Sequence, residues 1–115
     1  MSMELKKAWR ERWRRRERKR QEISRKAFAF AEAVAERLKN GFQCEEVYLI
    51  GSLARREFNE DSDIDLVVKG LKPEDFFRAA GEFLLSGEFP VDLIPYEEAG
   101  ALIRDCVESE GVRLR

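Results

Sequence analysis

The sequence predicts an α+β domain of two layers, in which a small mixed sheet is backed by helices and preceded by a long N-terminal helix. Residues 1–40 contain no proline or glycine and are rich in arginine, glutamate, lysine and alanine, which favours one continuous helix. Three short stretches carry the apolar residues typical of strands. The first ends at Ile50, and the other two span residues 63–69 and 90–94. Helical patterns separate these strands, so helices and strands alternate along the chain.

The N-terminal helix is predicted to have two parts with different surfaces. Asn40-Gly41 indicates its end. Its first half has almost no apolar stripe, so we divide the chain into a basic helical extension at 1–23 and a domain at 24–115. The second half has apolar residues at helical spacing, which should pack on a sheet or on another helix: Ile23, Ala27, Phe30, Val34 and Leu38.

The remaining elements follow from local signals. Ser52 is the expected N-cap of a short helix at 53–58, and a turn at 59–62 leads into the second strand. Another helix should begin at Lys72-Pro73, where proline suits the first turn. A last helix is expected over 96–110, followed by an extended tail. The inward face of the helix after Pro73 is predicted to comprise Phe76, Phe77, Ala80, Phe83 and Leu84.

The net charge of −1 hides two halves of opposite sign. Residues 1–40 hold 14 lysines and arginines against 6 acidic residues, a net charge of +8, whereas the remaining residues hold 8 against 17. Histidine is absent, which excludes a histidine base and a histidine-ligated metal. We find no signal peptide and no long apolar run, and we therefore expect a cytoplasmic protein that does not bind a membrane.

Two tryptophans stand out in the basic first half. Trp9 and Trp13 lie four residues apart, one above the other on a helix, in a run of arginines that includes Arg16. A solvated helical extension whose tryptophans pack on a neighbour is one explanation. A protein partner, including a second copy of this chain, is another, and nucleic acid is a third, less favoured because the rest of the chain is acidic.

The candidate chemistry lies where the first strand turns back into the second. Gly51-Ser52 follows an apolar strand, and such a turn presents backbone N–H groups that suit a phosphate. Asp63 and Asp65 are two positions apart and share one face of the second strand. Asp92 projects from the third strand, and three clustered carboxylates suit Mg²⁺ or Mn²⁺. This pattern predicts metal-assisted phosphoryl or nucleotidyl transfer.

These residues resemble the nucleotidyltransferases of the DNA polymerase β superfamily. The similarity consists of Gly51-Ser52, a ten-residue spacer, Asp63-x-Asp65 and a later lone Asp92 between apolar residues. The segments Gly-Ser-Leu-Ala-Arg and Ser-Asp-Ile-Asp-Leu are similar to sequences of the minimal nucleotidyltransferase (MNT) branch. The resemblance covers about residues 24–115 and implies a polymerase-β-like fold.

The resemblance also implies roles for single residues. Gly51 and Ser52 would hold the β- and γ-phosphates of ATP, with Arg55 near them. Asp63, Asp65 and Asp92 would ligate two Mg²⁺ ions, which Mn²⁺ could replace, and Asp92 would help to activate the acceptor. Arg56 stands where the branch often has glycine, so it would either add a phosphate contact or crowd the turn.

For the whole protein, the resemblance implies an antitoxin that transfers AMP from ATP to a HEPN-domain partner. A second hypothesis is a binding module that neutralises its partner by contact, with Trp9, Trp13 and Arg16 reaching over it. A third is a nucleic-acid binder that uses the arginine-rich helix. The sequence leaves the acceptor, the base preference and a homo-oligomer through the N-terminal helix open.

Overall fold

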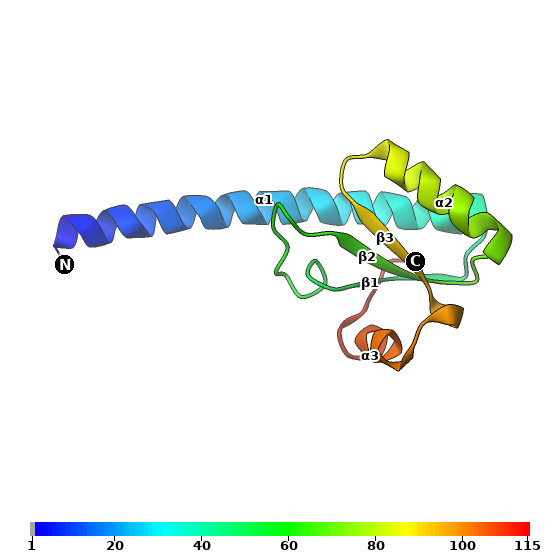
Figure 1. Ribbon diagram of the computed structural model, residues 1–115. Helices are drawn as coiled ribbons and strands as arrows, with labels where there is room; N and C mark the ends of the chain where they lie inside the picture. The colour runs from blue at the N-terminus through cyan, green and yellow to red at the C-terminus, as the bar shows by residue number, and fades with distance from the viewer. Residues whose placement is uncertain (1) are drawn as a thin grey trace.

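The computed structural model describes residues 2–115, without the side chains of residues 84–86. Figure 1 shows one very long helix, α1, that runs over a small sheet and extends far beyond it. The elements in chain order are α1 (Met3–Phe42), β1 (Glu46–Ile50), β2 (Ile64–Lys69), α2 (Pro73–Ser86), β3 (Val91–Pro95), the 3₁₀ helix η1 (Tyr96–Glu98), α3 (Ala101–Glu110) and β4 (Val112–Arg113).

The four strands form one mixed sheet in the order β3-β2-β1-β4. β1 is antiparallel to both β2 and β4, whereas β2 and β3 are parallel. The register pairs Ile50 with Asp65, and Asp65 with Asp92. The predicted α+β class and mixed sheet are therefore confirmed. The segment predicted only as an extended tail forms a fourth strand, because Val112 pairs with Leu49.

Helices cover both faces of the sheet. Figure 1 shows α1 and α2 on one side and α3 on the other. On the side of α1, alternate residues of β1 and β2 join the buried residues of α1 in one hydrophobic core. The β1 and β2 side chains in that core are Val47, Leu49, Ile64, Leu66 and Val68. Asp65 lies between two of them in sequence and therefore points to the opposite face, where α3 packs.

The first half of α1 stands away from this core. Ala27 is the first fully buried residue, and Trp9 and Trp13 are 60% and 61% exposed. The molecule is consequently elongated, with principal extents of 62 × 30 × 18 Å. The helix is continuous across residue 23, where packing against the core begins with the partly buried Ile23, so the division into extension and domain stays a prediction. No helix within residues 2–115 is long and apolar enough to cross a membrane.

The predicted helix ends need two corrections. α1 does not stop at Asn40-Gly41 but continues to Phe42, and Gln43 ends it in the left-handed conformation at φ 58°. Burial of Phe42 in the core offsets the weak helix propensity of Gly41. The helix expected over 96–110 is in two pieces, because the backbone is extended at Ala99 and Gly100.

Three further expectations also differ from the structure. Residues 53–58 form no helix but a hydrogen-bonded turn, in which the Arg55 and Glu57 N–H groups donate to the carbonyls of Gly51 and Ser52. Phe77, predicted to face inward, is 83% exposed, and the α2 residue buried in the core beside Phe83 is Ala79. Leu84 lies outside the described side chains.

Candidate active site

The turn after β1 lies directly against a carboxylate of β2. Gly51 has φ +80°, which side chains rarely tolerate, and a Cβ there would lie 2.4 Å from Asp65 Oδ2. Only glycine lets the backbone come this close to Asp65. Ser52 follows, half-buried, and its hydroxyl has no hydrogen-bond partner among residues 2–115. The turn therefore places a free hydroxyl next to the end of β2 that bears Asp65.

Asp65 and Asp92 are neighbours across the parallel strands β2 and β3. Their register pairs them directly, which puts their backbones about 4.8 Å apart and both side chains on the same face. Burial raises the pKa of the Asp65 carboxyl, and the charges of Asp92 and then Asp63 raise it further, whereas Arg55 opposes them. Asp92 and Asp63 thus both act electrostatically on Asp65.

The donor chemistry of these carboxylates suits a hard divalent cation such as Mg²⁺. Like charges on adjacent strands repel each other, and a bound cation would remove that repulsion. Asp63 and Asp92 are exposed, and Asp65 is half-buried. Within the described part of the chain, however, no three acidic, cysteine or histidine side chains are gathered closely enough to hold a metal ion. These carboxylates are of the chemical type that binds Mg²⁺, but their side chains are not gathered into one cluster.

A fourth carboxylate reaches the turn from the end of α3. Arg55 Nη1 donates to both oxygens of Glu110, at 3.2 and 3.3 Å, and the Gly51 N–H donates to Glu110 Oε1 at 3.4 Å. Arg55 Nε also donates to Glu57 at 3.2 Å. Sequence reasoning missed Glu110, because it lies 55 residues after Arg55 and belongs to no local motif.

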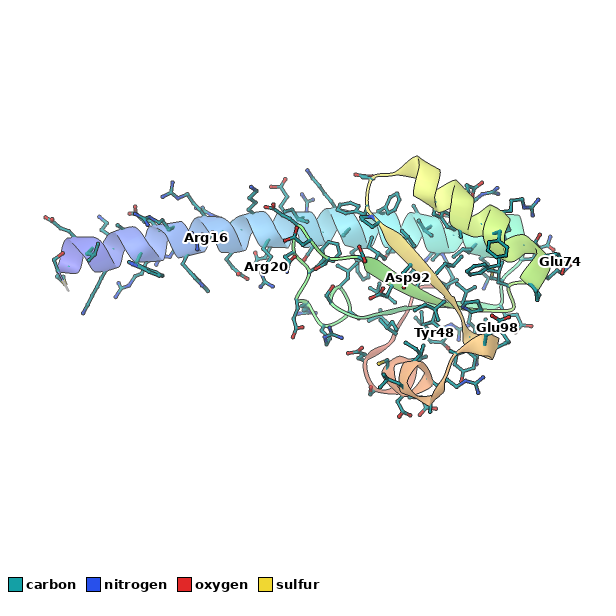
Figure 2. All side chains as sticks on the ribbon, viewed as in Figure 1. Arg16, Arg20, Tyr48, Glu74, Asp92 and Glu98 are labelled. Carbon is teal, nitrogen blue, oxygen red and sulfur yellow. The ribbon has the colours of Figure 1, made fainter. Side chains whose placement is uncertain are left out.

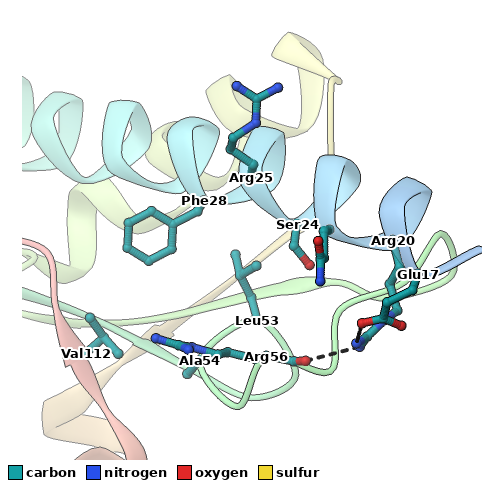
Figure 3. Close-up of a pocket in the computed structure, with 10 residues that line it drawn as sticks. Glu17, Arg20, Ser24, Arg25, Phe28, Leu53, Ala54, Arg56 and Val112 are labelled. Atoms are coloured by element: carbon teal, nitrogen blue, oxygen red, sulfur yellow. Dashed lines mark hydrogen bonds and ion pairs between the residues drawn. The ribbon is translucent and has the colours of Figure 1, made fainter. Parts of the chain in front are cut away.

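Arg56 lies apart from the carboxylates. It has a positive φ of 63°, a conformation that favours glycine. Its side chain lines a cleft of about 730 Å³ between α1 and the turn, together with Arg20, Arg25 and Phe28 (Figure 3). None of the three aspartates lines this cleft. Arg56 therefore combines a backbone conformation that favours glycine with a place in a cleft that none of the three aspartates lines.

The structure does not bring the tryptophans to the carboxylates. Trp9, Trp13 and Arg16 lie with Arg12 around a small hollow of about 90 Å³ on the extension. Figure 2 shows Arg16 on the part of α1 that projects beyond the sheet, whereas Asp92 lies on β3. Two contacts tie the base of the extension to the turn region: Arg20 donates to the Arg56 carbonyl at 3.1 Å, and Lys19 pairs with Glu60.

The mixed sheet thus carries a glycine turn packed against Asp65, and Asp92 is paired with Asp65 on the next strand. The family model described as "Polymerase beta, Nucleotidyltransferase" matches residues 32–115, and the chain belongs to this family. The extension lies outside the match. Comparison with curated proteins found no match.

Solved structures agree with this assignment. A protein described as a "putative minimal nucleotidyltransferase" is 28% identical, with a TM-score of 0.62, and the match covers 77% of this chain and 93% of that one. A toxin–antitoxin structure with AMP-PNP is 22% identical, with a TM-score of 0.62 and coverage of 73% and 72%. A Shewanella oneidensis complex of a tri-AMPylated HEPN toxin with its MNT antitoxin is 21% identical, with a TM-score of 0.56 and coverage of 76% and 71%. The fold of this chain is therefore similar to the folds of these minimal-nucleotidyltransferase structures.

Proposed function

We propose that this protein transfers AMP from ATP to a hydroxyl group of a protein partner. The observation that carries the proposal is the direct pairing of Asp65 with Asp92 beside the Gly51 turn. Two Mg²⁺ ions held by Asp63, Asp65 and Asp92, with Mn²⁺ as a substitute, would offset the charge of the triphosphate and acidify the acceptor hydroxyl.

The chain's own residues have distinct tasks in this proposal. The Gly51 N–H, the free Ser52 hydroxyl and the Arg55 guanidinium bind the phosphates. Asp92, exposed on the edge strand β3, takes the proton of the acceptor hydroxyl. The acceptor oxygen then bonds to the α-phosphorus, the bond to the bridging oxygen breaks, and pyrophosphate leaves.

The proposed acceptor is a HEPN-domain protein. Support comes from the similar Shewanella oneidensis complex, in which an MNT antitoxin accompanies an AMPylated HEPN toxin. The exposed position of Asp92 at the edge of the sheet also allows a large acceptor to approach. The protein would thus act as an antitoxin that modifies its partner.

The test uses ATP labelled at the α-phosphate, Mg²⁺ and a co-expressed HEPN partner. The wild type should label the partner, and Asp65→Asn should abolish labelling because the central carboxylate charge is lost. Asp61→Asn is the matched control, since Asp61 is exposed and is not among the charges that shift the pKa of Asp65. Absence of labelling by the wild type with Mg²⁺ or Mn²⁺ would contradict the proposal, as would full labelling by Asp65→Asn.

The extension supports a second candidate, an antitoxin that neutralises its partner by contact. Trp9 and Trp13 are more than half exposed, and basic residues surround them. Large exposed aromatics beside arginines are typical of energetically important interface positions. Neutralisation of the partner in cells would then survive Asp65→Asn but fail in the double variant Trp9→Ala/Trp13→Ala. The opposite result favours catalysis.

A further inference from the structure

Glu110 occupies donor groups that the proposed function assigns to phosphate. Its carboxylate accepts from the Gly51 N–H and from Arg55 Nη1. We propose that Glu110 is a resident anion of the phosphate-binding turn, which the phosphates of the nucleotide must displace and which therefore weakens nucleotide binding. This inference rests on the proposed function, because it concerns the same site.

The fold holds Glu110 at this position. Glu110 is the last residue of α3, and Gly111 follows, where a Cβ would lie 2.4 Å from the Val107 carbonyl. The chain then enters β4, where Val112 pairs with Leu49 of β1. Since Gly51 directly follows β1, the pairing of β4 with β1 brings the end of α3 next to the turn. The Glu110 side chain is only 21% exposed.

The hydrogen bonds indicate that Glu110 competes with phosphate for Arg55 and Gly51, rather than holding Arg55 in position. Arg55 has a second carboxylate partner, because its Nε donates to Glu57, so the guanidinium stays anchored without Glu110. Glu110 instead accepts hydrogen bonds from Arg55 Nη1, which can equally donate to a phosphate, and from the Gly51 N–H. A phosphate oxygen and a carboxylate compete for the same N–H group, and their negative charges repel each other.

The local charge adds to this competition. Glu110 brings another negative charge to a turn that already packs against Asp65. Hydrogen bonds to the Glu57 and Glu110 carboxylates raise the pKa of Arg55, so the guanidinium stays charged and its positive charge is already paired with protein carboxylates before nucleotide arrives. Removing one of these charges leaves more of the arginine's attraction for an incoming polyphosphate.

The test compares Glu110→Gln with the wild type and with Glu108→Gln. Glutamine keeps the shape of glutamate without its charge, and Glu108 is an exposed neighbour on the same helix. Affinities for inorganic tripolyphosphate and for ATP are measured by calorimetry on the full chain, and circular dichroism verifies that each variant folds. Glu110→Gln should bind tripolyphosphate about two- to fivefold more tightly, the factor that a partly exposed ion pair contributes. Glu108→Gln should match the wild type.

Salt provides a second measurement. The affinity ratio between Glu110→Gln and the wild type should fall towards one as ionic strength rises, because the competition is electrostatic. Equal or weaker tripolyphosphate binding by folded Glu110→Gln overturns the inference, even if AMP transfer occurs. Tighter tripolyphosphate binding without any AMP transfer supports the inference and contradicts the proposed function, so the two failures are distinguishable.

Discussion

Replacing Gly51 by alanine tests the contact between the turn and Asp65. Gly51 has φ +80°, and the new Cβ would lie 2.4 Å from Asp65 Oδ2. The left-handed backbone alone costs about 1–2 kcal/mol for a residue with a Cβ. The carboxylate must also move, which brings the expected loss of unfolding free energy to about 1–3 kcal/mol. At about 4 °C per kcal/mol for a chain of this size, Tm should fall by about 4–12 °C.

The assay is thermal unfolding followed by circular dichroism, with Gly81→Ala as the matched control. Gly81 lies within α2, and a Cβ there would meet no atom within 4 Å. The same substitution should therefore stabilise the protein by about 0.5–1 kcal/mol, because alanine favours a helix. AMP transfer should be lost in Gly51→Ala, since the methyl group displaces Asp65, and retained in Gly81→Ala.

One result would refute this reasoning. If Gly51→Ala melts within about 1 °C of the wild type while Gly81→Ala behaves as expected, then the turn does not pack against Asp65 in solution. In that case, the geometric basis for placing the phosphates beside Asp65 would be wrong.

Three further predictions concern the same site and the extension. Asp65→Asn should raise Tm at pH 7 by about 1–4 °C while abolishing transfer, because it removes the cost of burying a charged carboxylate and the like-charge repulsion with Asp92. Because the pKa of Asp65 is raised in the folded protein, the contribution of this carboxyl to wild-type stability is fully present below the pKa of the unfolded chain and is lost as pH rises through the folded pKa. The melting curves of the wild type and Asp65→Asn should therefore converge near pH 3. Arg56→Gly should raise Tm by about 4 °C, since it relieves about 1 kcal/mol of strain at φ 63°, and an unchanged Tm would contradict this. Trp9→Ala/Trp13→Ala should leave Tm within about 1 °C, because both side chains are exposed, and a clear fall in Tm would place them in the folded core.

The sequence determined the elements and the candidate chemistry. Apolar stretches predicted β1, β2 and β3 within a few residues, and the uninterrupted helix-forming run predicted α1. The polymerase β nucleotidyltransferase family was recognisable from Gly51-Ser52, Asp63-x-Asp65 and Asp92, because these positions are constrained by one local turn and by alternation along a strand. The positive φ of Arg56 is a backbone conformation that favours glycine, the residue that the MNT resemblance implies at this position.

Only the tertiary structure decided which distant groups meet. The parallel register that pairs Asp65 with Asp92 depends on the packing of α2 across the crossover between β2 and β3, and no local signal specifies it. The pairing of β4 with β1 and the resulting contact of Glu110 with Gly51 join residues 59 positions apart. Burial of Phe42 in the core likewise extends α1 beyond Gly41. Local propensities amount to about 1 kcal/mol per residue or less, so packing and strand pairing outweigh them at these positions.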